Sequence, residues 1–388
     1  MSPFIQILDG GLGTSLEDNY NIHFDSSSTP LWSSHLLVSK QGQATLLACQ
    51  RDFAAVPVDV LLTATYQVSI EGFARTRTDE FPDGVTSRDA VARYLADALD
   101  IAESAAAQGS STCSRTATSN ITTAAAAAAA AAATTTTTVS TTTGCERAEI
   151  ALSLGPYGAC MVPGQEYSGR YDAAHDGEEE LVQWHLERLR LFGDADVLRR
   201  VRYVAFETLP RLDELRAVRR AVHAAGITVP FWVSCVFPDP EGEGEEGKET
   251  GLRLPDGSTV EQVVHAALAE MGDGAMPWGV GINCTKVHKL PALVDRYGRC
   301  VEQMLAAGQI RAAPALVLYP DGTKGEVYNT TTQRWEKKGD WLYSRPWEEQ
   351  LAQVVRDAQR RRPFSSFIVG GCCKASHHDI KRLRAQFK

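Results

Sequence analysis

The sequence lacks any uninterrupted apolar stretch of the ~18 residues that a membrane-spanning helix requires. It also has no long basic run, and its 39 lysines and arginines are outnumbered by 48 aspartates and glutamates, giving a net charge of −9. Nucleic acids and anionic membranes attract basic surfaces, so we expect binding to neither. The first residues have no basic start followed by an apolar stretch, as an export signal would, which predicts a cytoplasmic protein.

Common catalytic motifs are missing as well. The chain has no Gly-x-Ser-x-Gly elbow, no Gly-x-x-x-x-Gly-Lys-Ser/Thr phosphate loop and no His-Glu-x-x-His zinc motif. Gly10-Gly11-Leu12-Gly13 follows an expected strand, but Leu16 stands where a dinucleotide-binding loop has its third glycine. Any catalytic site in this chain must therefore be formed by other residues than these motifs provide.

Cysteine is the residue type that stands out. The nine cysteines are odd in number and irregularly spaced, at positions 49, 113, 145, 160, 235, 284, 300, 372 and 373. Without an export signal, this pattern predicts free thiols rather than a disulfide framework. Adjacent Cys372 and Cys373 are also poorly placed to pair with each other, because disulfide geometry is restrictive.

Short apolar runs alternate with amphipathic stretches along the chain, which predicts one α/β domain over residues 1–388. Near-continuous apolar runs are typical of parallel strands buried on both faces; they fall at 4–8, 60–65, 150–154, 203–206, 231–236, 278–282, 315–319 and 367–369. Helices are expected between and after them, at 40–54, 88–108, 177–193, 211–225, 259–271, 290–307, 347–360 and 377–387. Eight strand–helix repeats indicate a (β/α)8 TIM-type barrel, with a doubly wound open sheet as the alternative. We expect helix caps at Ser258, with Glu261 three residues on, and at Ser376, with Asp379 three residues on.

Two segments fall outside this alternation. Residues 110–143 form a low-complexity alanine and threonine tract that cannot build a packed core, so we expect a disordered or partly helical insertion between the second helix and the third strand. In a barrel that connection lies on the face opposite the chemistry. Residues 238–257, rich in glutamate and glycine, follow the fifth strand on the catalytic side; we interpret them as a solvated loop, with a flap as the alternative.

Three thiols stand at the expected ends of two strands: Cys284 after one strand, and Cys372 and Cys373 after Gly370-Gly371. Zinc favours tetrahedral sulfur and nitrogen ligands, and catalytic zinc sites use three protein ligands and leave one position open. A metal-bound thiol is deprotonated, whereas a free thiol with a pKa near ~8.5 is mostly protonated at neutral pH. The pattern predicts a zinc-activated sulfur nucleophile. The alternatives are buried thiols without a metal, a closed structural site, and extra ligation by His377 or His378.

Several stretches, taken together and in order, resemble the homocysteine S-methyltransferase family. They are Leu8-Asp9-Gly10-Gly11-Leu12-Gly13-Thr14, Leu62-Thr63-Ala64-Thr65-Tyr66-Gln67, Ser153-Leu154-Gly155-Pro156-Tyr157-Gly158, Gly164-Gln165-Glu166-Tyr167-Ser168-Gly169, Phe206-Glu207-Thr208, Gly281-Ile282-Asn283-Cys284-Thr285 and Val369-Gly370-Gly371-Cys372-Cys373. The resemblance implies a barrel that binds one Zn²⁺ through Cys284, Cys372 and Cys373 and methylates homocysteine to methionine. One local departure is the run Lys374-Ala375-Ser376-His377, where the family commonly has arginine or glycine and then threonine; it puts the local cap and any substrate contact from that turn in doubt.

The resemblance also implies the substrate contacts. Asp9 and Glu207 match carboxylates that contact homocysteine through its amino group, and the remaining substrate-binding candidates are Thr14, Tyr66, Gln67 and Asn283. It implies a sulfonium methyl donor, S-methylmethionine or S-adenosylmethionine, for which Trp32 and Tyr66 are candidate cation–π partners. Betaine, a methylcobalamin partner and a non-catalytic zinc or thiol-binding barrel remain as alternatives. The sequence leaves the oligomeric state open.

Overall fold

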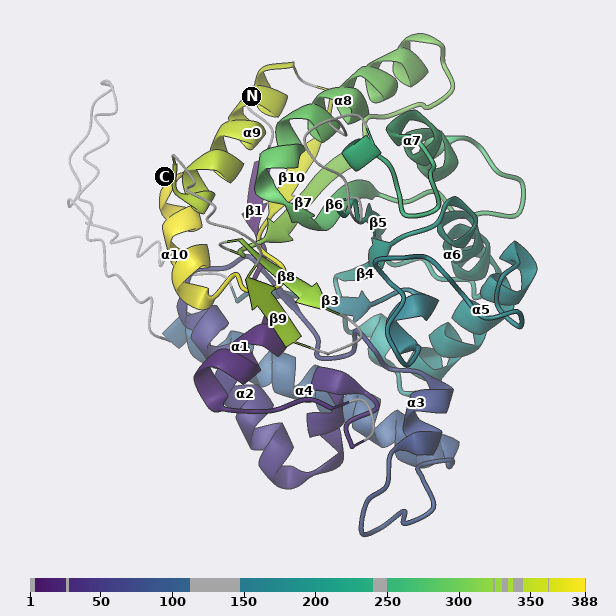
Figure 1. Ribbon diagram of the computed structural model, residues 1–388, viewed down its shortest axis with the longest axis vertical. Helices are drawn as coiled ribbons and strands as arrows, with labels where there is room; N and C mark the ends of the chain where they lie inside the picture. Colours follow the sequence, from purple (N-terminus) through teal and green to yellow (C-terminus); the bar gives the residue numbers. More distant parts are fainter. Residues whose placement is uncertain are drawn as a thin grey trace, which may run out of the picture.

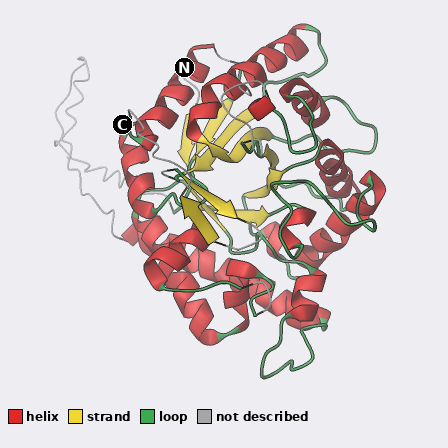
Figure 2. Cartoon of the chain, in the orientation of Figure 1, coloured by secondary structure: helices red, strands yellow, loops and turns green. Residues whose placement is uncertain are grey.

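The computed structural model describes residues 4–25, 28–111, 147–239, 250–323, 325–329, 334–337, 345–361 and 363–387. Eight strands form one parallel sheet in the order β1-β10-β7-β6-β5-β4-β3-β2. A parallel bridge from Leu8 to Val60 joins the two edges, so that the sheet closes into a barrel (Figures 1 and 2). The strands are β1 (Phe4–Ile7), β2 (Val60–Leu62), β3 (Glu149–Leu154), β4 (Tyr203–Leu209), β5 (Phe231–Cys235), β6 (Gly279–Lys286), β7 (Ala315–Asp321) and β10 (Ser366–Val369).

Helices surround the barrel and shield its apolar outer face (Figure 2). They are α1 (Leu12–Tyr20), α2 (Lys40–Ala55), α3 (Ile70–Arg75), α4 (Arg88–Ser111), α5 (Glu178–Asp194), α6 (Leu212–Ala224), α7 (Val260–Leu268), α8 (Leu290–Ala306), α9 (Trp347–Arg361) and α10 (His377–Ala385). An antiparallel hairpin, β8 (Glu326–Asn329) with β9 (Arg334–Lys337), lies across the barrel opening in Figure 1. The described residues thus form a (β/α)8 TIM-type barrel, and the open-sheet alternative is wrong.

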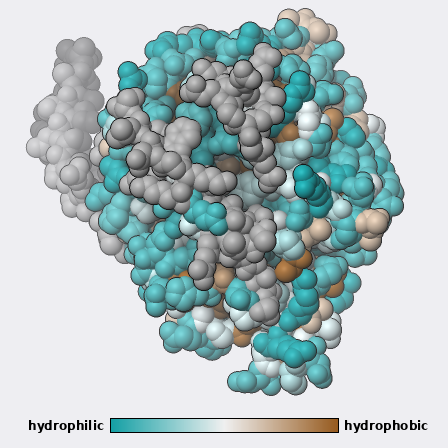
Figure 3. Space-filling model, viewed as in Figure 1, coloured by the Kyte–Doolittle hydropathy of each residue, from teal (hydrophilic) through white to brown (hydrophobic). Residues whose placement is uncertain are grey.

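Two apolar layers hold the barrel together. The interior is filled by alternate residues of neighbouring strands, which form their own cluster: Leu8, Val60, Ala151, Tyr203, Ala205, Trp232, Val317, Tyr319 and Ile368. A larger cluster lies between the strands and the helices. This division explains the near-continuous apolar runs in the sequence, because each strand residue is buried on one side or the other. The face toward the barrel opening presents mostly hydrophilic residues in its described part (Figure 3).

The expected elements are confirmed, with differences at their ends. All eight strands and the eight expected helices are present, whereas α1, α3 and the β8–β9 hairpin were not predicted. Strands β4, β6 and β7 run farther than expected, so Glu207, Cys284 and Asp321 lie within strands rather than after them.

The cap of α7 is Thr259, whose hydroxyl accepts from the Gln262 N–H, and not Ser258. The expected cap of α10 is confirmed: the Asp379 carboxylate accepts from both the N–H and the hydroxyl of Ser376.

Two expectations lie wholly or largely beyond the described residues. Of the alanine and threonine tract at 110–143, the structure describes only the end of α4, and Cys113 and Cys145 lie outside the described residues. Of the loop at 238–257, it describes residues 238–239 and 250–257. Among the described residues, no helix is both long and apolar enough to cross a membrane.

Candidate functional site

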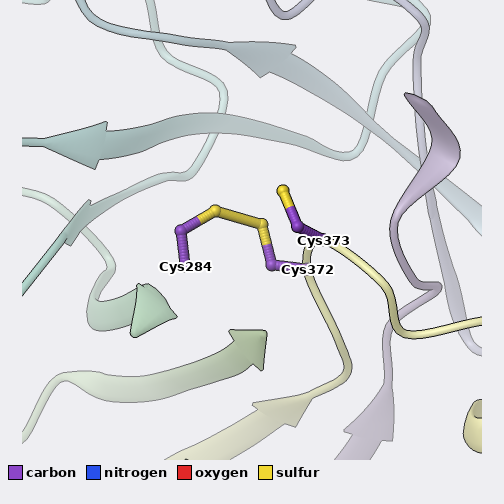
Figure 4. Close-up of side chains that lie close together, drawn as sticks. All are labelled: Cys284, Cys372 and Cys373. Carbon is purple, nitrogen blue, oxygen red and sulfur yellow. A yellow bond between two sulfur atoms is a disulfide. The ribbon is translucent and has the colours of Figure 1, made fainter. Parts of the chain in front are cut away.

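Three cysteine sulfurs gather at the carboxyl ends of the barrel strands. Cys284 comes from β6, and Cys372 and Cys373 come from the turn after β10 (Figure 4). The three sulfur atoms all lie within 4.8 Å of one another. Active sites of (β/α)8 barrels form at this end of the strands. The structure therefore brings together the three residues that the sequence predicted as metal ligands.

The cysteines differ in their bonding. Cys284 and Cys372 are joined by a disulfide with a Cα–Cα separation of 5.5 Å, and Cys373 is a free thiol (Figure 4). The expectation of free thiols is wrong for this pair, although it holds for Cys49, Cys160, Cys235, Cys300 and Cys373. A disulfide sulfur is not a thiolate, so only the reduced pair can serve as metal ligands. In reduced form, three clustered thiols match the soft ligand set that zinc prefers.

The strand that carries Cys284 is irregular at the site. The pairing register between β6 and β7 shifts between Asn283 and Lys286, and that between β4 and β5 shifts between Phe206 and Leu209. Cys284 and Thr208 both adopt positive φ, 47° and 60°, a conformation that side chains other than glycine seldom take. Such irregularities turn side chains away from the regular alternation. They occur here at the strand ends that carry Cys284 and Glu207.

Asn283 joins these two irregular strands. Its Oδ1 accepts from the Thr208 N–H at 2.7 Å, and its Nδ2 donates to Thr208 Oγ1 at 2.7 Å. Thr208 Oγ1 lies 3.8 Å from Cys284 Sγ, and Asn283 Nδ2 lies 4.0 Å from Cys372 Sγ. Asn283 is fully buried and is not part of the cavity lining. Its amide therefore fixes the backbone around the sulfurs.

Glycines set the position of the two adjacent cysteines. A Cβ on Gly370 would approach the Asp9 carbonyl oxygen to 2.7 Å, and one on Gly371 would approach the Ala375 Cβ to 2.3 Å. Only glycine permits this close approach. The Lys374 N–H donates to Thr14 Oγ1 at 2.8 Å, and the Gly11 N–H donates to the Ala375 carbonyl at 3.0 Å. The unusual run after the cysteines thus forms an ordered turn, and Thr14 ties it to the start of α1.

Asp9 and Glu207 are buried carboxylates beside the cavity. Asp9 Oδ2 accepts from the Leu62 N–H at 2.9 Å, while its buried Oδ1 has no hydrogen-bond partner. Glu207 lines the cavity and accepts from the Ser153 hydroxyl. Burial raises the pKa of Asp9 well above its usual range, and the neighbouring Glu207 raises it further. Burial also raises the pKa of Glu207 to about 7. Two desolvated carboxyl groups with an unpartnered oxygen favour a cationic ligand.

Aromatic side chains form part of the cavity wall. Trp32 and Tyr66 both line the cavity, with ring centroids 6.3 Å apart in an edge-to-face arrangement. Gln67 and Thr14 line the same cavity, as do Cys284, Cys372 and Cys373. Of the expected ligand and substrate residues, only Asp9 and Asn283 lie outside the lining. His377 contacts Phe53, and His378 is exposed in the first turn of α10, so neither belongs to the cysteine cluster.

The sequence did not single out several cavity residues. Glu166 and Tyr167 lie on the connection after β3, Tyr319 on β7, and Trp335 on β9. Glu166 and Tyr167 stand within a quoted motif, but nothing in the sequence shows that Glu166 is buried. Trp335 belongs to the unpredicted hairpin, and the Lys374 ammonium lies 5.4 Å from the centroid of its ring.

The chain is thus a (β/α)8 barrel with a cluster of three cysteines and two buried carboxylates at its opening. The family model for homocysteine S-methyltransferases matches residues 6–387. The chain therefore belongs to the homocysteine S-methyltransferase family and is a methyltransferase that acts on homocysteine.

Relatives match over almost the full length. The chain is 24% identical to the homocysteine S-methyltransferase YbgG of Bacillus subtilis, with 98% of this chain and 93% of that protein covered. It is 27% identical to the betaine-homocysteine S-methyltransferase of Drosophila melanogaster, with 97% and 92% covered. Among solved structures, the metallated homocysteine methyltransferase MmuM of Escherichia coli superposes with a TM-score of 0.63 at 20% identity, covering 98% of this chain and 96% of that one. The likeness to MmuM supports the (β/α)8 barrel fold.

Proposed function

We propose that this protein transfers a methyl group from a sulfonium donor, S-methylmethionine or S-adenosylmethionine, to the sulfur of homocysteine in a zinc-dependent reaction. The observation that carries the proposal is the cluster of Cys284, Cys372 and Cys373 in the same cavity as Glu207 and the aromatic wall. In the transfer, the bond between the methyl carbon and the donor sulfur breaks and a bond to the homocysteine sulfur forms. The donor leaves as a neutral thioether, and the thiol proton is released.

Asp9 and Glu207 bind the homocysteine ammonium group in this proposal. The unpartnered Asp9 Oδ1 and the Glu207 carboxylate are acceptors in a buried environment, where a charge-assisted hydrogen bond is strong. The cation would in turn stabilise both carboxyl groups in their charged form. Homocysteine would thereby be oriented with its sulfur toward the three cysteines.

The reduced thiolates of Cys284, Cys372 and Cys373 would hold the zinc ion, leaving a fourth position for a substrate atom. When bound, zinc lowers the pKa of a coordinating thiol so that the thiol is deprotonated at neutral pH. The cysteine turn is held in place by Thr14 and the glycines, and Asn283 acts as a positioning residue for the strand ends.

The donor needs positioning more than acid–base catalysis, since a thioether leaves without protonation. Trp32 and Tyr66 present aromatic groups to the cavity, and an aromatic face attracts a sulfonium cation by cation–π interaction. Thr14 and Gln67 are proposed as further substrate contacts from the rim.

Methionine formation tests the proposal directly. Reduced, zinc-loaded protein would be given homocysteine with S-methylmethionine, S-adenosylmethionine or betaine in parallel, with and without a chelator. We expect turnover with a sulfonium donor and its loss after chelation. Turnover with betaine alone would favour the second candidate donor, which the similarity to the Drosophila melanogaster betaine-homocysteine S-methyltransferase keeps open. Folded protein that holds one zinc per chain without turnover would support a non-catalytic zinc-binding barrel.

A further inference from the structure

Glu166 is a carboxylate of the cavity wall that takes no part in the proposed methyl transfer. The Glu166 side chain lines the cavity and is only 8% exposed, and its buried Oε2 has no hydrogen-bond partner. Among the described residues, no basic side chain forms an ion pair with it. Desolvation raises its pKa to about 7. A buried carboxylate oxygen without a partner is destabilising unless a ligand supplies one, so this oxygen points to a ligand.

The segment that carries Glu166 is held firmly. The Glu214 carboxylate of α6 accepts from the Tyr157 N–H at 2.6 Å and contacts His185 Nε2 at 3.0 Å, and it also accepts from the Tyr171 hydroxyl. The Gln165 N–H donates to the Gly158 carbonyl at 2.8 Å. The segment is thus anchored on both sides of Glu166. The unpartnered oxygen belongs to a built site rather than to a loosely held loop.

Glu166 comes from a different element than the homocysteine carboxylates: it lies on the connection after β3, whereas Asp9 follows β1 and Glu207 lies on β4. Glu207 acts electrostatically on Asp9 and also on Tyr66, and Glu166 acts on Tyr66, Tyr167 and Cys373. It therefore lies on the aromatic side of the cavity, where the proposed function places the methyl donor. An ammonium group has three N–H donors and can satisfy the unpartnered oxygen, whereas a sulfonium has none.

We infer that Glu166 binds the α-ammonium group of the methyl donor and thereby selects an amino-acid sulfonium over a donor that lacks this group. The inference rests on the proposed function and assigns a donor-selecting residue to it. S-Methylmethionine and S-adenosylmethionine both carry an α-ammonium group beside their sulfonium. Betaine has a quaternary nitrogen without N–H donors and cannot satisfy Glu166 in this way.

The test compares Glu166→Gln with the wild-type enzyme using two sulfonium donors. S-Methylmethionine carries the α-ammonium group, and 4-(dimethylsulfonio)butanoate has the same carbon chain, sulfonium and carboxylate without it. We expect Glu166→Gln to raise the KM for S-methylmethionine by about 10- to 100-fold, the range for losing a hydrogen bond to a charged group. The KM for homocysteine and that for 4-(dimethylsulfonio)butanoate should stay unchanged. Glu71→Gln is the matched control, because Glu71 is an exposed carboxylate on α3, near the same connection but outside the lining.

Calorimetry of S-methylmethionine binding to reduced, zinc-loaded protein without homocysteine gives a readout that does not depend on turnover. Weaker binding by Glu166→Gln, with Glu71→Gln like wild type, would support the inference. A rise in the KM for homocysteine alone, or equal losses with both donors, would overturn it. No methionine from the wild type with any donor would instead contradict the proposed function. The calorimetric comparison would then still decide whether Glu166 recognises the ammonium group.

Discussion

At the scale of single residues, Cys373 offers the clearest test of the metal site, because its sulfur is free while the other two are bonded to each other. Under reducing conditions we expect the wild type to bind one zinc per chain and Cys373→Ser to bind it more than ~100-fold more weakly, since losing even an outer partner costs ~10- to 100-fold. Zinc affinity is measured by competition with a chelator. Turnover should disappear together with the zinc.

The control is Cys300→Ser, which replaces a buried cysteine of α8 outside the cluster. It should retain zinc and turnover, with at most a loss of stability. If Cys373→Ser kept full zinc affinity, the three-sulfur site would be wrong. If it lost folding stability as well as zinc, a closed structural site would be favoured.

The sequence predicted the cysteine cluster because strand ends can be read from apolar runs, and parallel strands bring their ends to one rim. It could not predict the role of Glu166. Burial and the lack of a partner at that residue depend on packing between the connection after β3 and the rest of the cavity wall. Likewise, nothing in the chain order shows that the amide of Asn283 binds Thr208 instead of facing the cavity.

At the scale of elements, the irregular ends of β4 and β6 depend on Asn283. In Asn283→Ala, the buried Thr208 N–H loses its acceptor, which should lower the free energy of unfolding by about 1–3 kcal/mol. The Asn283 amide also lies 4.0 Å from Cys372 Sγ and holds Thr208, whose hydroxyl lies 3.8 Å from Cys284 Sγ, so we also expect zinc affinity to fall by ~10- to 100-fold. Urea unfolding of the metal-free protein and chelator competition measure the two effects.

Thr285→Val provides the comparison on the same strand. Thr285 Oγ1 accepts from the Phe237 N–H at 3.0 Å and donates to the Asn283 carbonyl, so its loss should reduce stability. Zinc affinity should nevertheless stay near that of the wild type. Equal zinc loss in both variants would mean that Asn283 acts only through general stability.

The same strands show why element ends were misjudged. Asn283, Thr285 and Asp321 are polar, so the apolar runs seemed to stop before them, yet all three lie buried within strands. Their side chains form hydrogen bonds with other residues of the barrel. The order of apolar and polar residues in the sequence does not show these hydrogen bonds. Helix α3 has only six residues, too few to show a helical period, and it was missed for that reason.

At the scale of the whole molecule, Glu166 makes the stability of the ligand-free protein depend on pH. Its pKa is about 7 in the folded state against an ordinary value of 4.5, so between these values the folded protein binds a proton that the unfolded chain does not. Stability from this group is present below pH 4.5 and is lost as pH rises through 7. Glu166→Gln lacks this loss. The difference between its free energy of unfolding and that of the wild type should therefore increase by up to ~3 kcal/mol as the pH rises from 4.5 to 8.

Urea unfolding at several pH values measures this difference, with Glu71→Gln as the control. A wild-type-like slope in Glu71→Gln and a flatter one in Glu166→Gln are expected. An unchanged difference between Glu166→Gln and wild type across this range would contradict the desolvation of Glu166 in the folded protein.

The barrel also separates the site from the alanine and threonine tract. Helix α4 ends at Ser111 and β3 begins at Glu149, so the tract joins the barrel at the amino end of β3, while the cysteines lie at the carboxyl ends of the strands. Deleting residues 112–142 leaves 143–148 as a connection of ordinary length. We expect zinc content, the KM for homocysteine and turnover to stay as in wild type, because loop length changes the closure entropy only slowly. A large loss of turnover in a deletion protein that unfolds at the wild-type temperature would show that the tract reaches the catalytic side.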